Sequence, residues 1–424
     1  KKINSKAKSR NFAPHGGLAR RYKTTILMKV KLLLLFAFAL SLTGCRQEST
    51  EVYDPTQAPV VSMSQQFTLM WEMLDRGYVF WDVDKTDWDA VYNTYLPKFK
   101  ALDDRTEIPT EELAALYKEA CATLVDHHMH IRIKNYFAPS DETGDKTVHI
   151  TPGDDEVKKR SYYSTISDDD FTTFYSALQA QGRVSDFKDG YFLATNNSKF
   201  RITSFVIDGA YAYLHFNGFF LNELASGTCK DGIDFKQPAT AAMEALKQWL
   251  AHINNKQIKG LIIDLRNNGG GDSSDLYLVL GPLTENTFTC GYTHYKQGLG
   301  RLDYSEWAPW QVNPNPNIPA QKGLPIACLI NANSVSMGEI TPTAIKMMPN
   351  TKVIGERSYG ATGPLASDSN FTYGTPASSK DGSVYAYTST FCFKDTHGKI
   401  LEGNGVEPDQ SVSYDKAAFL QGND

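Results

Sequence analysis

The sequence predicts an α/β fold with a partly parallel sheet, and two segments of the chain carry that prediction. The first, "IKGLIIDLRNNGGGDSSDLYLVLGPL" (residues 258–283), has the pattern of a buried strand, a glycine-rich turn and a helix. The second, "LPIACLINANSVSMGEITPTAIKMMPNTKVIGE" (residues 324–356), repeats strand, turn and helix and adds another strand. Strands that alternate with helices are typical of parallel pairing. Ligands in such sheets bind at the carboxyl ends of the strands, where both turns lie.

Other elements surround this layer. "FTLMWEMLDRGYVFWD" (residues 67–82) has apolar residues at helical spacing and belongs to residues 62–137, which we expect to form a small helical domain. "SFVIDGAYAYLHFNGFF" (residues 204–220) predicts two strands around a turn, and "PATAAMEALKQWLAHINN" (residues 238–255) predicts an amphipathic helix. Residues 138–203 are polar and show no clear period, so we expect an inserted segment there.

Composition restricts the class of function. The 424 residues allow two or three domains, and the net charge of −5 at pH 7 provides no basic excess for binding nucleic acid. The six cysteines are scattered and form no Cys-x-x-Cys pair, so we expect no zinc site. The oligomeric state does not follow from the sequence.

The N-terminal region carries an export pattern. "MKVKLLLLFAFALSLTGC" (residues 28–45) has lysines, then an apolar run, then small residues before a cysteine, and it is too short to span a bilayer stably. The ending "LTGC" resembles the bacterial lipobox, which implies that Cys45 is lipid-modified; a buried apolar helix is the alternative. We therefore expect a true start at Met28 after a leader, a tether over residues 46–61, and an exported lipoprotein of the cell envelope, periplasmic or associated with the outer membrane.

Two serines follow the second strand of the α/β layer. Ser334 and Ser336 lie in "NANSVSMGEI", where a helix is predicted to begin near Ser336 or Met337. A serine at a helix start can cap the helix by accepting a backbone N–H bond. It can also be a nucleophile, because the helix dipole favours its alkoxide and the next backbone N–H can stabilise an oxyanion. Spacing alone does not separate these roles.

Three further segments offer chemistry. The glycines of "DLRNNGGG" (residues 264–271) expose backbone N–H groups that suit an anion, or simply form a tight turn. "LVDHHMHIRI" (residues 124–133) crowds three histidines at a helix-to-strand junction, where one can be a general base, a metal ligand or a packed side chain. Glu402 in "ILEGNGVEPDQSV" can orient a histidine or simply solvate a turn.

Together these segments resemble the C-terminal processing peptidase family, also called tail-specific proteases. The matching pieces are "GLIIDLRNNGGG", "NANSVSMGEITPTAIKMMPNTKVIGERSYGATG" and "LEGNGVEPD", in the family's order. "LVDHHMHIRI" is similar to the family's Leu-x-Asp-x-His segment. The resemblance implies a crotonase/ClpP-like αββ catalytic core, here residues 204–424. Many members carry a PDZ domain before that core, but residues 138–203 lack its carboxylate-binding loop.

The resemblance also implies the catalytic residues. The family's nucleophile stands three residues before the helix glutamate, which selects Ser336. The lysine base of the main bacterial branch is absent, because Ala361 follows Gly360. The tricorn-like branch uses Ser-His-Glu, which implies His128 as the base, with His127 as the alternative, and Glu402 as its partner.

The implied oxyanion hole consists of the backbone N–H groups of Met337 and of Gly269 or Gly270. The resemblance implies no metal and no cofactor. The expected function is a serine endopeptidase that hydrolyses proteins through an acyl-enzyme. The alternative is an inactive protein on the same scaffold that binds a peptide or an apolar ligand.

Overall fold

The computed structural model describes residues 60–152, 155–231, 239–298, 300–365 and 377–423. The leader, the export pattern that ends at Cys45 and nearly all of the tether lie outside this part of the chain. Within the described ranges no helix has both the length and the apolar character needed to cross a membrane.

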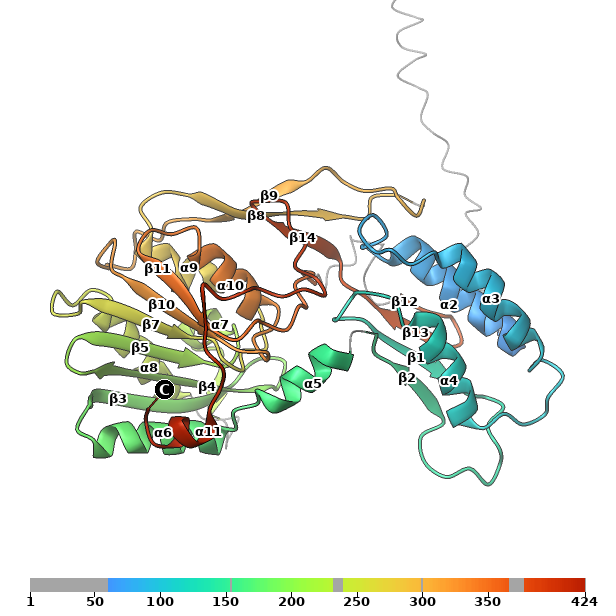
Figure 1. The fold of residues 1–424 in the computed structure, drawn as a ribbon, viewed down its shortest axis with the longest axis horizontal. Helices are drawn as coiled ribbons and strands as arrows, with labels where there is room; N and C mark the ends of the chain where they lie inside the picture. The colour runs from blue at the N-terminus through green and yellow to red at the C-terminus, as the bar shows by residue number, and fades with distance from the viewer. Residues whose placement is uncertain (1–59, 153–154, 232–238, 299, 366–376, 424) are drawn as a thin grey trace, which may run out of the picture. The chain divides into compact units, whose positions relative to one another are not determined.

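The order of elements mixes helices and strands along the whole chain (Figure 1). The helices are α2 Met63–Gly77, α3 Trp88–Lys100, α4 Thr110–Cys121, α5 Asp155–Tyr163, α6 Asp168–Ala180, α7 Leu221–Ala225, α8 Thr240–His252, α9 Asp275–Val279, the short η2 Gly281–Leu283, α10 Met337–Ile345 and α11 Lys416–Leu420. The strands are β1 His130–Lys134, β2 Thr147–Ile150, β3 Val184–Leu193, β4 Lys199–Ile207, β5 Tyr211–Phe216, β6 Lys230–Asp231, β7 Gly260–Asp264, β8 Phe288–Tyr295, β9 Ala308–Val312, β10 Ile326–Ile330, β11 Thr351–Gly355, β12 Ala377–Ser378, β13 Val384–Tyr387, β14 Phe391–Asp395 and β15 Gln410–Ser411.

The central sheet has eight strands in the order β15-β11-β10-β7-β5-β4-β3-β6. The strands from β15 to β5 are parallel to their neighbours, whereas β4, β3 and β6 pair antiparallel. The turn between β4 and β5 has positive φ at Asp208 (51°) and Gly209 (65°), the two residues at which the sequence predicts the turn. The predicted α/β class and the partly parallel sheet are confirmed.

Helices cover both faces of this sheet. Successive residues of β5 point to opposite sides, so Ala212 and Leu214 pack in the cluster that contains Leu246 of α8. Tyr213 packs instead in the cluster formed with α6 and α11. Figure 1 shows α6 and α11 side by side near one edge of the sheet, where Phe174 and Phe419 stack with ring centroids 4.4 Å apart. The sheet is therefore buried on both sides, and its loops carry the exposed chemistry.

The N-terminal region differs from the predicted helical domain. Helices α2, α3 and α4 are present, but they pack on a four-stranded antiparallel sheet in the order β12-β13-β1-β2. Strands β12 and β13 come from residues 377–387, inside the predicted catalytic core. The division at residue 137 was wrong for this reason: β1 pairs with β13 across more than half of the chain, a contact that local periodicity does not encode.

The predicted insert at residues 138–203 is also divided differently. Strand β2 pairs with β1, while β3 and the start of β4 belong to the central sheet. Between them, α6 packs on that sheet beside α11. Residues 184–203 are thus part of the catalytic sheet rather than a separate domain. The polar surface of β3 explains the error, because exposed and buried residues alternate only in part along this strand.

A third, three-stranded sheet in the order β14-β8-β9 links the two regions. In the connection from β8 to β9, the guanidinium of Arg301 bonds to Asp75 of α2 (2.5 Å) and to Asp89 of α3 (2.6 Å). This three-way ion pair attaches the N-terminal helices to the catalytic region. The five cysteines of the described chain are all buried and free.

Candidate active site

Ser336 lies at the carboxyl end of β10, directly before α10, as the sequence predicts. Its backbone has φ 57° and ψ −117°, a conformation that non-glycine residues rarely adopt and that costs about 1–3 kcal/mol. Two hydrogen bonds hold it there, because the N–H of Ser336 donates to the carbonyl of Ala361 (3.0 Å) and to the carboxylate of Glu339 (3.1 Å). Backbone strain at the first residue of a helix is a feature of activated nucleophiles.

Glycines allow the two turns to meet at Ser336. A Cβ on Gly270, which has φ 88°, would lie 2.5 Å from the Cβ of Ser336. A Cβ on Gly338 would lie 2.6 Å from the carbonyl oxygen of Asn268. Only glycine permits this approach, so the glycine-rich turn after β7 is needed for close packing against the nucleophile turn.

Ser334, the other serine of this turn, has a structural role. It is fully buried, its Oγ donates to the carbonyl of Leu265 (2.7 Å), and it accepts the N–H of Asn331 (3.1 Å). These bonds tie the ends of β7 and β10 together.

We expect Ser334→Ala to lower the free energy of unfolding by about 1–3 kcal/mol, because the buried N–H of Asn331 loses its partner and the carbonyl of Leu265 loses one of two. Chemical denaturation measures this change. An unchanged denaturation midpoint would contradict the structural role of Ser334.

Glu339 organises the loop beside the nucleophile. Its fully buried carboxylate accepts bonds from Ser358 Oγ (2.5 Å), Gly360 N (2.7 Å) and Ala361 N (2.8 Å), in addition to the Ser336 N–H. Burial raises its pKa to about 7, and the hydrogen bonds act in the opposite direction. Sequence reasoning missed this role and used Glu339 only to locate Ser336. A charged residue inside the apolar run of α10 was the available signal.

Glu402 lies in the loop before β15 and is also buried. Its Oε1 accepts the backbone N–H of His127 (2.8 Å), and its Oε2 accepts those of Thr362 (2.6 Å) and Gly363 (2.7 Å). Burial raises its pKa well above the usual range, and nearby Asp126 raises it further.

His128 lies in the turn before β1, next to Glu402. One ring nitrogen of His128 and one carboxylate oxygen from each of Asp126 and Glu402 lie within 4.8 Å of one another. Its Nδ1 is buried and has no hydrogen-bond partner among the described residues. Burial, together with neighbouring His127, lowers the pKa of His128 to about 4, so the ring is neutral at pH 7 and can accept a proton.

His130 is in a different environment. It begins β1, and its Nε2 lies 3.2 Å from Nδ1 of His149 on β2. His128 precedes this strand, so it does not share a strand face with His130.

One loop joins the two halves of the site. Within the described chain, no hydrogen bond connects Ser336 Oγ to His128. However, Ala361 accepts the N–H of Ser336, and the next residue, Thr362, donates its own N–H to Glu402. Consecutive Cα atoms are about 3.8 Å apart, so the nucleophile turn and the partner of His128 are held by adjacent residues. Within the predicted triad, Ser336 and Glu402 are thus held by consecutive residues of one loop.

The oxyanion hole differs in part from the expectation. The N–H of Gly269 donates to the carbonyl of Asn217 (3.1 Å), and that of Gly270 donates to Oδ1 of Asn268 (2.9 Å). Both predicted glycine donors are therefore occupied in this conformation. The N–H of Met337 has no acceptor among the described residues and lies 3.0 Å from the position of a Cβ on Gly270.

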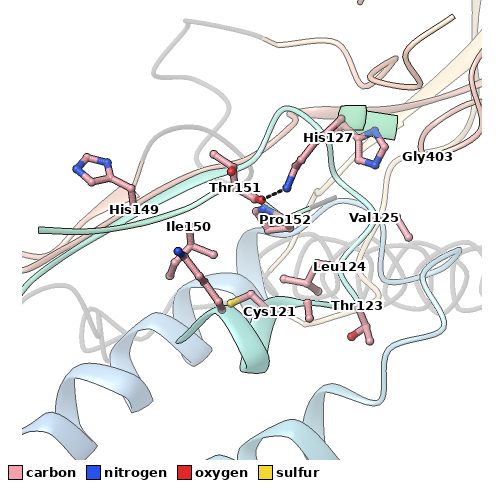
Figure 2. Close-up of a pocket in the computed structure, with 13 residues that line it drawn as sticks. Cys121, Thr123, Leu124, Val125, His127, His149, Ile150, Thr151, Pro152 and Gly403 are labelled. Atoms are coloured by element: carbon pink, nitrogen blue, oxygen red, sulfur yellow. Dashed lines mark hydrogen bonds between the residues drawn. The ribbon is translucent and has the colours of Figure 1, made fainter. Parts of the chain in front are cut away.

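A cavity of about 820 Å³ opens beside His127 (Figure 2). Its walls come from the end of α4, the turn that carries His127, the end of β2 and the start of α5. Gly403, the neighbour of Glu402, also lines it. Figure 2 shows His127 and Gly403 close together at one side of this space. Such a cavity can receive side chains of a bound substrate.

Within the described ranges, Asp126, His128 and Glu402 also form a group whose ligand atoms are close enough together to hold a metal ion. Its carboxylate oxygens already accept backbone N–H bonds, such as those of His128 to Asp126 (2.9 Å) and of Thr362 to Glu402. These bonds occupy lone pairs that a bound cation would otherwise use. The expectation of a metal-free site stays a prediction.

Two protein-family models and several known proteins match parts of this chain. The model of peptidase family S41 matches residues 210–412, and that of the tricorn protease C1 domain matches residues 59–108. A nisin-resistance protein of Lactococcus lactis subsp. lactis is 32% identical over 177 residues, which are 40% of this chain and 51% of that protein. A Staphylococcus epidermidis protein named "Probable CtpA-like serine protease" is 25% identical over 175 residues, 41% of this chain and 32% of its own.

This chain therefore spans about half the length of the first relative and about a third of the second. A solved structure of a Parabacteroides merdae protein superposes with a TM-score of 0.56 at 21% identity, covering 85% of this chain and 93% of the other, which shows a shared fold. The S41 model spans the part of the chain that carries Ser336, Glu339 and Glu402. These comparisons support the C-terminal processing peptidases, peptidase family S41, as the family that this chain is similar to.

Proposed function

We propose that the chain is a serine endopeptidase that cleaves peptide bonds through an acyl-enzyme on Ser336. The observation that carries the proposal is the loop of residues 358–363. This loop binds Glu339 and Ser336 at one end and Glu402 at the other. The strained nucleophile and the acid next to His128 are therefore positioned by one short segment.

The proposed reaction follows from these positions. Ser336 Oγ attacks the substrate carbonyl carbon, and its proton passes to the neutral ring of His128. Glu402 stabilises the imidazolium, and the N–H of Met337 donates to the oxyanion. His128 then returns the proton to the leaving amine, so the peptide C–N bond breaks and Ser336 carries the acyl group. Water, deprotonated by His128, hydrolyses this ester and restores the enzyme.

The cavity beside His127 is proposed to bind the substrate chain. Ala122, at the end of α4, is exposed and lines this cavity. Ala122→Trp places a large side chain in it without removing a buried contact. We expect kcat/KM for casein to fall by about 10-fold or more. Reaction of Ser336 with a small fluorophosphonate should stay unchanged. If cleavage of casein is also unchanged, substrates bind elsewhere.

The proposed location is the cell envelope, with a lipid anchor on Cys45. Its support is the export pattern of residues 28–45. Metabolic labelling with a tagged fatty acid tests this point, because Cys45→Ser should abolish incorporation of the lipid.

The activity itself is tested by incubating the purified chain with casein, a protein without stable structure. Fragments that accumulate with time support the endopeptidase. Saturable binding of peptides without cleavage would support the alternative, an inactive binding protein on the same scaffold.

A further inference from the structure

A second buried carboxylate lies beside the base, and the proposed mechanism does not use it. Asp126 belongs to the turn that carries His128 and is fully buried. Its Oδ1 accepts the N–H of His128 (2.9 Å) and the hydroxyl of Ser389 (2.9 Å), and its Oδ2 accepts the N–H of Ser389 (2.7 Å). It therefore holds the turn of the base to the loop between β13 and β14.

Asp126 and Glu402 both lie close to the imidazole of His128. The oxygen of each carboxylate and the His128 ring nitrogen lie within 4.8 Å of one another. The donors that reach the two carboxylates are uncharged N–H and O–H groups, such as those of Ser389 and Thr362. Two carboxylates this close in a buried site cannot easily both ionise.

We infer that Asp126 is a positioning residue for the base, and that Asp126 and Glu402 hold one proton between them beside His128. This inference rests on the proposed hydrolytic function of the same site. In the wild type, Glu402 can stabilise the imidazolium only when the shared proton is not on Glu402. The pair, rather than Glu402 alone, then sets the acid limb of the pH–rate profile.

The two pKa values agree in direction with this geometry. Burial raises the pKa of Asp126 to about 6, and it raises that of Glu402 well above the usual range, with Asp126 adding to the increase. The other titratable groups that face the pair are Tyr78, Tyr359, Tyr387, Cys392, His127 and Glu339.

The tyrosines and Cys392 stay neutral in the acid range, because burial raises their pKa values above the usual ones. Glu339 titrates near neutral pH, since its pKa is raised to about 7. It is present in the wild type and in every variant compared below, so its contribution cancels.

The test measures kcat/KM for casein from about pH 4 to about pH 9. In Asp126→Asn the repulsion of Glu402 is absent, so Glu402 ionises earlier and the acid limb should move to lower pH by about one unit. The remaining amide oxygen can still accept the N–H of His128. A merely structural role of Asp126 would lower activity at every pH and leave the limb in place.

Asp275→Asn is the matched control. Asp275 is equally buried and also accepts two backbone N–H bonds, from Leu221 (2.6 Å) and Asn222 (2.8 Å), but it is not part of the His128 cluster. Its substitution should leave the acid limb unmoved.

Ser389→Ala keeps the proposal testable if Asp126→Asn does not fold or is inactive. Without the Ser389 hydroxyl bond, the shared proton binds Asp126 more strongly, so Glu402 ionises at lower pH. The acid limb should again move to lower pH, by a smaller amount than in Asp126→Asn. An acid limb that is unmoved or moves to higher pH in the measurable variant overturns the inference. Absence of hydrolysis in the wild type would instead overturn the proposed function.

Discussion

Ser336→Ala is expected to lower kcat/KM for casein by about 10⁴-fold or more, the loss found when an attacking serine is removed. The Oγ of Ser336 forms a capping box with Glu339, and alanine keeps the Cβ that packs on Gly270. The two backbone bonds to Ala361 and Glu339 are also kept. Loss of the cap should lower the free energy of unfolding by about 1 kcal/mol.

Ser334→Ala is the comparison that separates the two serines. It should lose stability and keep its activity under conditions in which it is folded. Initial rates and denaturation curves of both variants give this two-way contrast. If Ser336→Ala cleaves casein as fast as the wild type, Ser336 is not the nucleophile.

His128→Ala is expected to lower kcat/KM by about 10²- to 10⁴-fold, because the serine proton then has no positioned acceptor. His128, rather than His127, has a ring nitrogen in the cluster with Glu402. The contribution of His127 to Glu402 is its backbone N–H, which every non-proline side chain preserves.

His127→Ala is the matched variant for this prediction. It removes an imidazole that packs edge-on against Tyr359, with ring centroids 5.5 Å apart, but it keeps the bond to Glu402. We expect a loss of at most about 10-fold, from looser packing of the turn. The reverse order, with His127→Ala the more damaging change, would make His127 the base.

Local pattern predicts much of the catalytic sheet. The apolar runs of the segment from β10 through α10 to β11 predict its order of strand, helix and strand, and the structure confirms that order. The hairpin at Asp208-Gly209 was likewise found from its turn residues. These features depend on neighbours within a few residues, where periodicity and turn chemistry act.

The contacts that complete the site are long-range, and local pattern does not contain them. The pairing of β1 with β13 and the bond from the His127 N–H to Glu402 both join distant segments. The N–H groups of Gly269 and Gly270 are occupied because the carbonyl of Asn217 and the side-chain oxygen of Asn268 accept them, and the sequence does not predict these two contacts. In the sequence, Asp126 is only one residue of a motif. Its position between Ser389 and His128 follows from the fold.

The most direct test of the nucleophile is covalent labelling. The purified chain is treated with a fluorophosphonate, which reacts with activated serines, then digested and mapped by mass spectrometry. We expect one adduct per chain, on the peptide that contains Ser336, with the same adduct in Ser334→Ala and none in Ser336→Ala. An adduct on another serine, or a wild-type chain that hydrolyses casein but is neither labelled nor inhibited, would contradict a catalytic Ser336.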